Sequence, residues 1–306
     1  MIIGHIIGIM EFLDVLKIVL IGIIEGITEW LPVSSTGHMI IFENLWERFG
    51  GVFWSAKFSE GFPDVFDYVI QLGAILAVVV LFFGRIFPFA LEERPIEENS
   101  EITKRKIVAR KDVFSMWLKI IVACLPAVVA VVVDAVLEDI NKTAEIVLIA
   151  SMLVLYGVAF IIVENANKGK QPKITDANQI TYKTAFLIGC FQILASIPGT
   201  SRSGVTIIGA LLLGLSRTTA AEFTFFLAIP TMVGTGAFKI LKFVLDGGSF
   251  STTEIGALIL GMVVAFAVSL LAIKMLMNFV KKHDFKIFGW YRIALGAVLL
   301  GICLIP

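Results

Sequence analysis

The sequence predicts an all-α integral membrane protein with six transmembrane helices and two re-entrant helix–loop–helix hairpins, arranged as an inverted-topology repeat. Three observations predict this fold class. Of the 306 residues, 58% are hydrophobic and 16% are charged, whereas soluble domains average about 25% charged residues. Six apolar runs are long enough to cross the roughly 30 Å of hydrocarbon in a bilayer. Two further apolar regions are interrupted by proline, glycine and hydroxyl residues.

The six uninterrupted runs are 19 to 27 residues long, and each contains only one to three charged residues. They cover 66–84, 114–137, 143–163, 221–243, 254–280 and 287–305. The interrupted regions are 12–46, broken at 32–37, and 184–216, broken at 198–204. A backbone opened at such a break cannot face lipid, because its N–H and C=O groups would lack partners. Each interrupted region is therefore expected to be a re-entrant hairpin buried among the other helices.

The distribution of Lys and Arg predicts the orientation of the helices. The loops 85–113, 164–183 and 281–286 carry fourteen of these residues, whereas the loops 42–65, 138–142 and 244–253 carry three. The positive-inside rule places the first group of loops in the cytoplasm. The protein is thus expected to be a multi-pass membrane protein with these loops on the cytoplasmic side.

Following the chain through this topology gives a single membrane domain, 1–306, with two halves of opposite orientation. The first repeat, 1–163, and the second, 184–306, each contain one hairpin and three spans. Inverted repeats with broken helices place ligand sites near the bilayer midplane. The site is therefore expected where the two breaks meet.

Two glutamates lie in the first hairpin. Glu25 and Glu29 are four residues apart, so on a helix they share a face. Ionisable groups at membrane depth are costly and usually functional. Two carboxylates this close do not both ionise easily, so one is expected to hold a proton, which suits general acid–base chemistry or cation binding. Carboxylates satisfied by neighbours at a wet rim are the plainer alternative.

The break in the first hairpin reads Pro-Val-Ser-Ser-Thr-Gly-His from Pro32 to His38. Free N–H groups at the start of the following helix, together with its dipole, favour an anion there. We expect Ser35 and His38 to be catalytic and the neighbouring residues to bind phosphate. These predicted phosphate ligands are Ser34, Thr36 and Gly37. An ordinary N-cap cluster is the alternative.

The break in the second hairpin reads Pro-Gly-Thr-Ser-Arg-Ser-Gly from Pro198 to Gly204. Arg202 is the one basic residue between Lys183 and Arg217, and its guanidinium fork fits a pair of phosphate oxygens. Alternatively, Arg202 forms an internal ion pair with Glu25 or Glu29. The hydroxyl neighbours of Arg202 are further predicted phosphate ligands: Thr200, Ser201 and Ser203.

The two breaks together provide the groups needed for phosphoryl transfer. Ser35 is the first candidate nucleophile, with Glu29 or His38 as its base, Arg202 as the stabilising cation and Glu25 tuning the base. Attack by His38, or by a water molecule oriented by Glu29, stays open. A divalent cation such as Mg²⁺ or Ca²⁺ is a possible cofactor, with Glu25 and Glu29 as its ligands; no organic cofactor is expected.

At 25–38 and 198–204, and again at 69–73 and 216–223, the sequence resembles the bacitracin-resistance family of undecaprenyl-diphosphate phosphatases. The resemblance covers nearly the whole chain; the departures are an insertion around 92–111 and a polar segment at 46–62. It implies a membrane enzyme that hydrolyses a C55-isoprenyl diphosphate to the monophosphate. It also implies a location in the bacterial inner (plasma) membrane, the inverted-repeat architecture and a site open to the outer, periplasmic face. The family's conserved site residues match Glu25, Glu29, Ser35, His38 and Arg202.

The expected partners are a long-chain prenyl diphosphate lipid and the bilayer, with a homodimer as a candidate assembly and no nucleic acid. A secondary transporter or flippase for a phosphorylated lipid or anion is the alternative function, because inverted repeats with broken helices are typical of transporters. Residue identity favours an enzyme, since a carrier does not need a hydroxyl nucleophile beside a histidine and two carboxylates.

Overall fold

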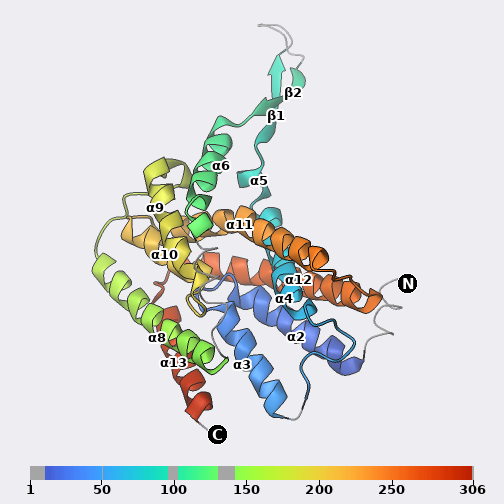
Figure 1. Cartoon of the computed structure of the whole chain (residues 1–306). Helices are drawn as coiled ribbons and strands as arrows, with labels where there is room; N and C mark the ends of the chain where they lie inside the picture. The colour runs from blue at the N-terminus through green and yellow to red at the C-terminus, as the bar shows by residue number, and fades with distance from the viewer. Residues whose placement is uncertain (1–10, 50, 96–102, 130–141, 305–306) are drawn as a thin grey trace.

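The computed structural model describes residues 11–49, 51–95, 103–129 and 142–304 and is predominantly helical (Figure 1). The α-helices and strands, with their bounds, are α2 (Phe12–Thr28), α3 (Ser35–Arg48), α4 (Phe62–Leu81), α5 (Phe83–Ile86), β1 (Phe89–Pro95), β2 (Thr103–Ala109), α6 (Lys111–Cys124), α8 (Lys142–Asn167), α9 (Tyr182–Ile193), α10 (Arg202–Leu212), α11 (Arg217–Leu245), α12 (Thr252–Val280) and α13 (Lys286–Leu304). Two 3₁₀ turns, η1 (Ala177–Gln179) and η2 (Leu194–Ser196), adjoin α9.

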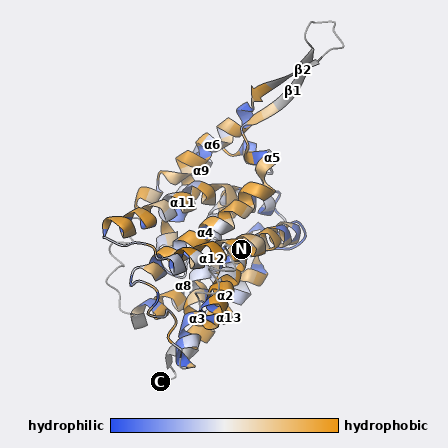
Figure 2. Cartoon of the chain, turned by 90° about the vertical axis from the view of Figure 1, so that its right-hand side faces the viewer, coloured by the Kyte–Doolittle hydropathy of each residue, from blue (hydrophilic) through white to orange (hydrophobic). Residues whose placement is uncertain are grey.

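Five helices in the described part of the chain are long and apolar enough to cross a membrane. They cover Phe62–Leu81, Lys111–Val129, Ala144–Asn167, Arg217–Leu245 and Thr252–Val280. These coincide with the first five predicted spans, although the part of 114–137 beyond residue 129 lies outside the described residues. The sixth predicted span, 287–305, coincides with α13, a helix of 19 residues. The fold is thus that of an α-helical membrane protein, and hydrophobic residues dominate its helices (Figure 2).

Both predicted breaks interrupt helices where proline, glycine and hydroxyl residues occur. In the first region, α2 ends at Thr28 and α3 begins at Ser35. In the second, η2 follows α9, and α10 begins only at Arg202. Proline lacks the N–H that a continuing helix needs, and serine hydroxyls replace the missing backbone partners at helix starts. Each break therefore leaves a short loop that leads directly into a new helix.

A β-hairpin occurs where the sequence indicated only a charged insertion. Strands β1 and β2 pair antiparallel and project from the helical body next to α5 and α6 (Figures 1 and 2). Their register pairs Glu92 with Lys106 and Glu93 with Arg105. The structure therefore departs here from the all-α fold class that the sequence predicts.

Close helix packing brings the C-terminal helix against the middle of the chain. A Cβ atom on Gly157 of α8 would lie 2.7 Å from the carbonyl oxygen of Gly289 on α13, and one on Gly289 would lie 2.7 Å from that of Gly157. Small residues permit this approach, which is how membrane helices associate without a hydrophobic driving force. The packing fixes the face of α13 that bears Tyr291 and Arg292.

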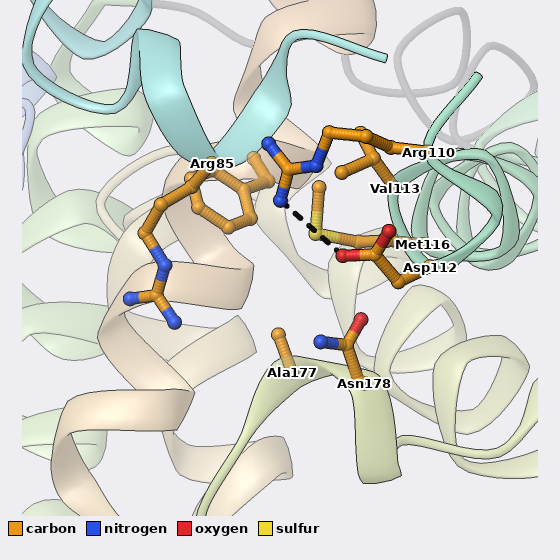
Figure 3. A pocket seen from close by; sticks show the side chains of 8 residues that line it. Arg85, Arg110, Asp112, Val113, Met116, Ala177 and Asn178 are labelled. Carbon is orange, nitrogen blue, oxygen red and sulfur yellow. Dashed lines mark hydrogen bonds and ion pairs between the residues drawn. The ribbon is translucent and has the colours of Figure 1, made fainter. Parts of the chain in front are cut away.

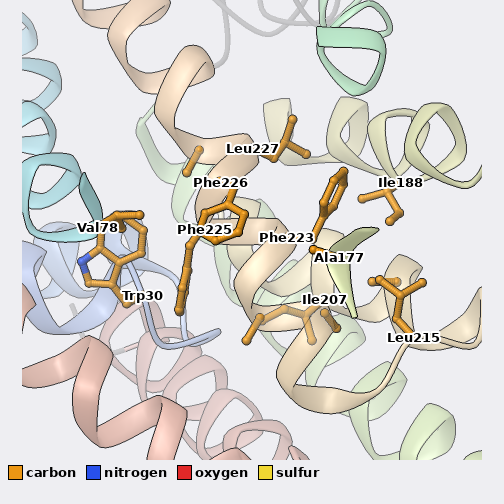
Figure 4. Packing of buried hydrophobic residues seen from close by; sticks show 14 of the residues in the cluster. Trp30, Val78, Ala177, Ile188, Ile207, Leu215, Phe223, Phe225, Phe226 and Leu227 are labelled. Carbon is orange, nitrogen blue, oxygen red and sulfur yellow. The ribbon is translucent and has the colours of Figure 1, made fainter. Parts of the chain in front are cut away.

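A large buried apolar cluster lies next to the first break. Trp30, in that break, makes an edge-to-face contact with Phe225 of α11, with ring centroids 5.2 Å apart (Figure 4). Trp30 is 1% exposed and Phe225 is fully buried. Aromatic pairs in this geometry are stabilising beyond the area they bury. The loop between α2 and α3 is therefore held against the core of the bundle.

Candidate active site

Glu29 connects the two breaks. Its Oε1 accepts a hydrogen bond from Nη2 of Arg202 at 2.7 Å, and its Oε2 accepts one from the Ser35 hydroxyl at 3.0 Å. Glu29 is 8% exposed, so both interactions occur largely away from water. Three residues that the sequence singled out from two distant segments therefore meet at one carboxylate. The internal ion pair between Arg202 and Glu29, the alternative named for Arg202, is the pairing present here.

The guanidinium of Arg202 keeps donors for an anion. Besides its bond to Glu29, it makes one long hydrogen bond, from Nη1 to the Thr231 hydroxyl at 3.4 Å. A guanidinium has five N–H donors. Donors on Arg202 thus remain for phosphate oxygens while the ion pair holds the side chain in place.

Two serines with an unusual backbone conformation begin the helices that follow the breaks. Ser34 has φ 74° and Ser201 has φ 70°, and they are the non-glycine residues with positive φ in the described ranges. Each serine caps its helix: the Ser34 hydroxyl accepts from the Gly37 N–H at 3.3 Å, and the Ser201 hydroxyl accepts from the Gly204 N–H at 3.2 Å. Strained backbone of this kind concentrates at functional sites.

His38 is held at both ring nitrogens. Nδ1 lies 2.7 Å from the carbonyl oxygen of Ser34, and Nε2 lies 2.7 Å from the hydroxyl of Tyr291 on α13. A carbonyl only accepts, so Nδ1 carries the proton and the neutral ring presents Nε2 as an acceptor to Tyr291. The partner of Ser35 here is Glu29 and not His38. The geometry therefore favours Glu29 as the base for Ser35.

Glu25 differs from Glu29 in its surroundings. It is fully buried, and neither of its carboxylate oxygens has a hydrogen-bond partner among the described residues. Buried polar atoms without partners are rare and call for an explanation. A proton on Glu25, or a ligand that donates to it, satisfies these oxygens.

The other predicted phosphate ligands occupy three kinds of position. Thr36 is exposed in the first turn of α3, and Gly37 is buried behind it. Ser203 is 5% exposed, with its hydroxyl 3.2 Å from that of Ser201. Thr200 is fully buried in the loop before α10. The structure thus groups these residues at the two helix starts, and their roles toward phosphate stay predictions.

Arg292 of α13 contacts the loops of both breaks, and the sequence analysis did not select it. Its side chain is fully buried; Nη1 donates to the Pro32 carbonyl at 3.2 Å, and Nη2 donates to the carbonyls of Gly199 and Thr200 at 2.9 and 2.8 Å. One side chain thus bridges both loops. The signal for it was present, because Arg292 is the one charged residue in the predicted span 287–305 and charges at membrane depth are usually functional.

A separate pocket, shown in Figure 3, contains none of the predicted site residues. It lies between α5, α6 and η1, where Arg110 donates to Asp112 at 3.3 Å and to the Gly84 carbonyl. Arg85, on its other wall, pairs with Glu222. Both arginines are therefore paired with carboxylates. We interpret the pocket as a gap within an ion-pair network that connects the base of the hairpin to the helical bundle.

Comparison with known proteins agrees with this geometry. The model of the family described as "Bacitracin resistance protein BacA" matches residues 18–298. Similar curated proteins include an undecaprenyl-diphosphatase of Lachnoclostridium phytofermentans (52% identical, covering 97% of this chain and 99% of the relative) and one of Enterococcus faecalis (51%, covering 95% and 98%). An undecaprenyl-diphosphatase 1 of Clostridium acetobutylicum is 50% identical over 95% of this chain and 98% of its own. With a family match across the hairpins, the spans and both loops joined at Glu29, this chain belongs to the bacitracin resistance protein BacA family.

Proposed function

We propose that this protein is a membrane phosphatase that hydrolyses undecaprenyl diphosphate to undecaprenyl phosphate and inorganic phosphate. This reaction recycles the lipid carrier of cell-wall synthesis and confers resistance to bacitracin. The observation that carries the proposal is the hydrogen bonding of Glu29 to both Ser35 and Arg202. Membership of the family and the names of its curated members support it.

In the reaction we propose, the Ser35 oxygen attacks the terminal phosphorus of the diphosphate. Glu29 accepts the hydroxyl proton along its existing hydrogen bond, and the bond from phosphorus to the bridging oxygen breaks, releasing the prenyl monophosphate. Water then hydrolyses the phosphoserine, and the proton on Glu29 returns to Ser35. Arg202 and the free N–H groups at the start of α3 and α10 stabilise the charge on the equatorial oxygens.

The alternatives for the nucleophile differ in what they require. Attack by His38 requires that Nε2 leave the Tyr291 hydroxyl, which it contacts at 2.7 Å. Direct attack by water requires a molecule to replace Ser35 at the Oε2 oxygen of Glu29. Trapping labelled phosphate on the protein distinguishes them: label on Ser35 supports the proposed route, label on His38 contradicts it, and no label favours water.

Tyr291 is expected to position His38. In a Tyr291→Phe variant the ring remains but the hydroxyl is lost, so Nε2 loses its hydrogen bond and the imidazole is free to reorient. We expect kcat/KM to fall about tenfold, the size of effect typical when a partner that orients a functional histidine is removed. Steady-state kinetics together with the ¹⁵N NMR shifts of the imidazole check this. Unchanged kinetics and an unchanged tautomer of His38 would contradict this role of Tyr291. Trp290→Phe, at the neighbouring exposed position, is the matched control.

The proposed architecture is an inverted repeat, 1–163 and 184–306, with six spans in the bacterial inner membrane and the site open to the periplasmic side. The two serine caps support it, because Ser34 and Ser201 are 167 residues apart, as are Gly37 and Gly204. At the same offset Gln192 corresponds to Glu25, and each has a buried side-chain oxygen without a partner in the described chain. The loop charges support the orientation.

A divalent cation is an open part of the proposal. The described residues hold no group of three or more His, Cys, Asp or Glu side chains suited to a metal ion. Glu29 is already bonded through both oxygens, so Glu25 is the carboxylate with free oxygens. A hard cation prefers oxygen ligands, and bound here it would use Glu25 together with diphosphate oxygens and supply charge neutralisation.

The experiment that tests the function is release of inorganic phosphate from a long-chain prenyl diphosphate by the purified protein in detergent, where no gradient exists. We expect turnover, and its loss on adding a chelator and recovery with Mg²⁺ or Ca²⁺ would support the cation. Absence of phosphate release, with uptake of the lipid or of phosphate into vesicles containing the protein, would instead establish a carrier.

A further inference from the structure

A second hollow lies between three long apolar helices, and none of the catalytic residues lines it. A hollow of about 570 Å³ opens where α4 ends, α11 begins and the last turns of α12 lie. Its apolar lining includes Leu81, Phe82 and Met277. All three helices are long and apolar enough to cross a membrane. A hollow between such helices is filled by lipid when the protein is in a bilayer.

Two lysines give this hollow a positive rim. Lys274 and Lys281, seven residues apart and hence on one face of α12 and its C-terminal extension, both line it. Both are exposed, and no hydrogen bond or ion pair to another described residue engages them. The acidic residue of the lining, Glu222, is paired with Arg85, whose guanidinium also lies 3.7 Å from Asp176. Lys281 also attracts Glu222 electrostatically, whereas Lys274 forms no ion pair with another residue in the described ranges, so the rim keeps cationic charge for a ligand.

The first turn of α11 adds to this rim. Thr218, in that turn, lines the hollow, and its hydroxyl lies 3.1 Å from that of the N-cap Ser216. The positive end of the dipole of a 29-residue helix therefore faces the same space as the two lysines. Cationic groups above an apolar floor between membrane helices are the arrangement that binds anionic phospholipid headgroups.

We propose that this hollow binds an anionic bilayer phospholipid, with its phosphate between Lys274 and Lys281 and its acyl chains along Leu81, Phe82 and Met277. In the proposed orientation it lies in the cytoplasmic leaflet. The site is distinct from the catalytic centre, because the ring of Phe82 contacts Phe225 with centroids 6.1 Å apart, and Phe225 in turn contacts Trp30 beside the catalytic loop. These aromatic rings separate the two sites.

The test is the binding of phosphatidylglycerol to the full chain in nanodiscs of phosphatidylcholine with increasing phosphatidylglycerol, counted by native mass spectrometry. We expect wild type to retain phosphatidylglycerol selectively. A Lys274→Ala/Lys281→Ala variant should bind it about twenty-five-fold more weakly, about fivefold for each lysine removed. A Lys168→Ala/Lys170→Ala variant, which removes the same charge from an exposed loop at the same end of the bundle, should bind it normally.

Two further variants separate the hollow from surface charge and from the active site. Met277→Trp keeps both lysines but fills the hollow, and it is expected to weaken binding as well. Ser35→Ala, which removes the proposed nucleophile without leaving a buried charge unpaired, is expected to leave it unchanged. Equal binding by wild type and the Lys274/Lys281 variant, an equal loss in the Lys168/Lys170 variant, or normal binding by Met277→Trp would each overturn the proposal. Thermal unfolding in pure phosphatidylcholine establishes that every variant is folded.

Discussion

Replacing Arg202 with glutamine is expected to lower kcat/KM for a prenyl diphosphate by about 10³-fold, at the upper end of the effect of removing one donor from an oxyanion site. The guanidinium contributes twice: it fixes Glu29 through the 2.7 Å bond, and in the proposed mechanism its remaining donors bind the phosphate. Arg202→Lys is expected to be nearly as impaired, because one ammonium cannot hold a carboxylate and a phosphate with fixed geometry. Phosphate release by purified variants in detergent measures both.

The control must separate catalysis from folding. Arg202→Gln leaves Glu29 buried without its cation, and breaking a buried pair costs about 3–5 kcal/mol of stability. A Glu29→Gln/Arg202→Gln double variant removes both charges and is expected to regain much of that stability while remaining inactive. Near-normal turnover in Arg202→Gln, or recovery of activity in the double variant, would contradict the proposed mechanism.

Most of the helical architecture could be predicted because a bilayer imposes strict rules on sequence. Helices must be apolar over about 20 residues, so apolar runs located the five spans that the structure bears out. Breaks in such runs need hydroxyls, glycine or proline to replace lost backbone partners, so the starts of α3 and α10 fell within the predicted breaks. The meeting of the two breaks was predicted, whereas the pair of Arg202 with Glu29 was only the alternative to a phosphate partner for the guanidinium.

What could not be predicted depends on contacts between segments far apart in the chain. From the sequence, Glu29 and His38 were equal candidates for the base of Ser35. Only the fold shows that Nε2 of His38 is hydrogen-bonded to the Tyr291 hydroxyl. The β-hairpin in the insertion was likewise hidden, because the charged residues of its two segments are consecutive and show no alternation of polar and apolar positions. The offset between the halves was obscured by a single residue, since Pro32 and Pro198 are 166 residues apart whereas the serine caps are 167 apart.

Arg292→Met is the second substitution expected to have a large effect, and it tests the link between the two loops. Methionine fills much of the same volume but leaves the carbonyls of Pro32, Gly199 and Thr200 without their donor. Unsatisfied buried groups cost about 1–3 kcal/mol each, so we expect a clear fall in the unfolding temperature. Lys286→Ala, which removes one positive charge from the first turn of the same helix, is the matched control and is expected to change neither stability nor activity.

Arg292 could stabilise the fold alone or also position the two loops for catalysis. The value of kcat for each folded molecule distinguishes these two roles. Its two Nη atoms reach opposite loops, so its loss lets the Ser35 and Arg202 sides of the site separate, and misplacement by about 1 Å costs up to about a hundredfold in rate. We therefore expect kcat, normalised to the folded fraction below the unfolding transition, to fall by about that factor in Arg292→Met. Arg292→Lys is expected to keep part of the stability yet lose most of the rate, because one ammonium cannot donate to both loops in the same geometry. A normalised kcat equal to wild type would show that the loops hold their positions without Arg292, and that the bond from Arg202 to Glu29 alone keeps the two halves of the site together.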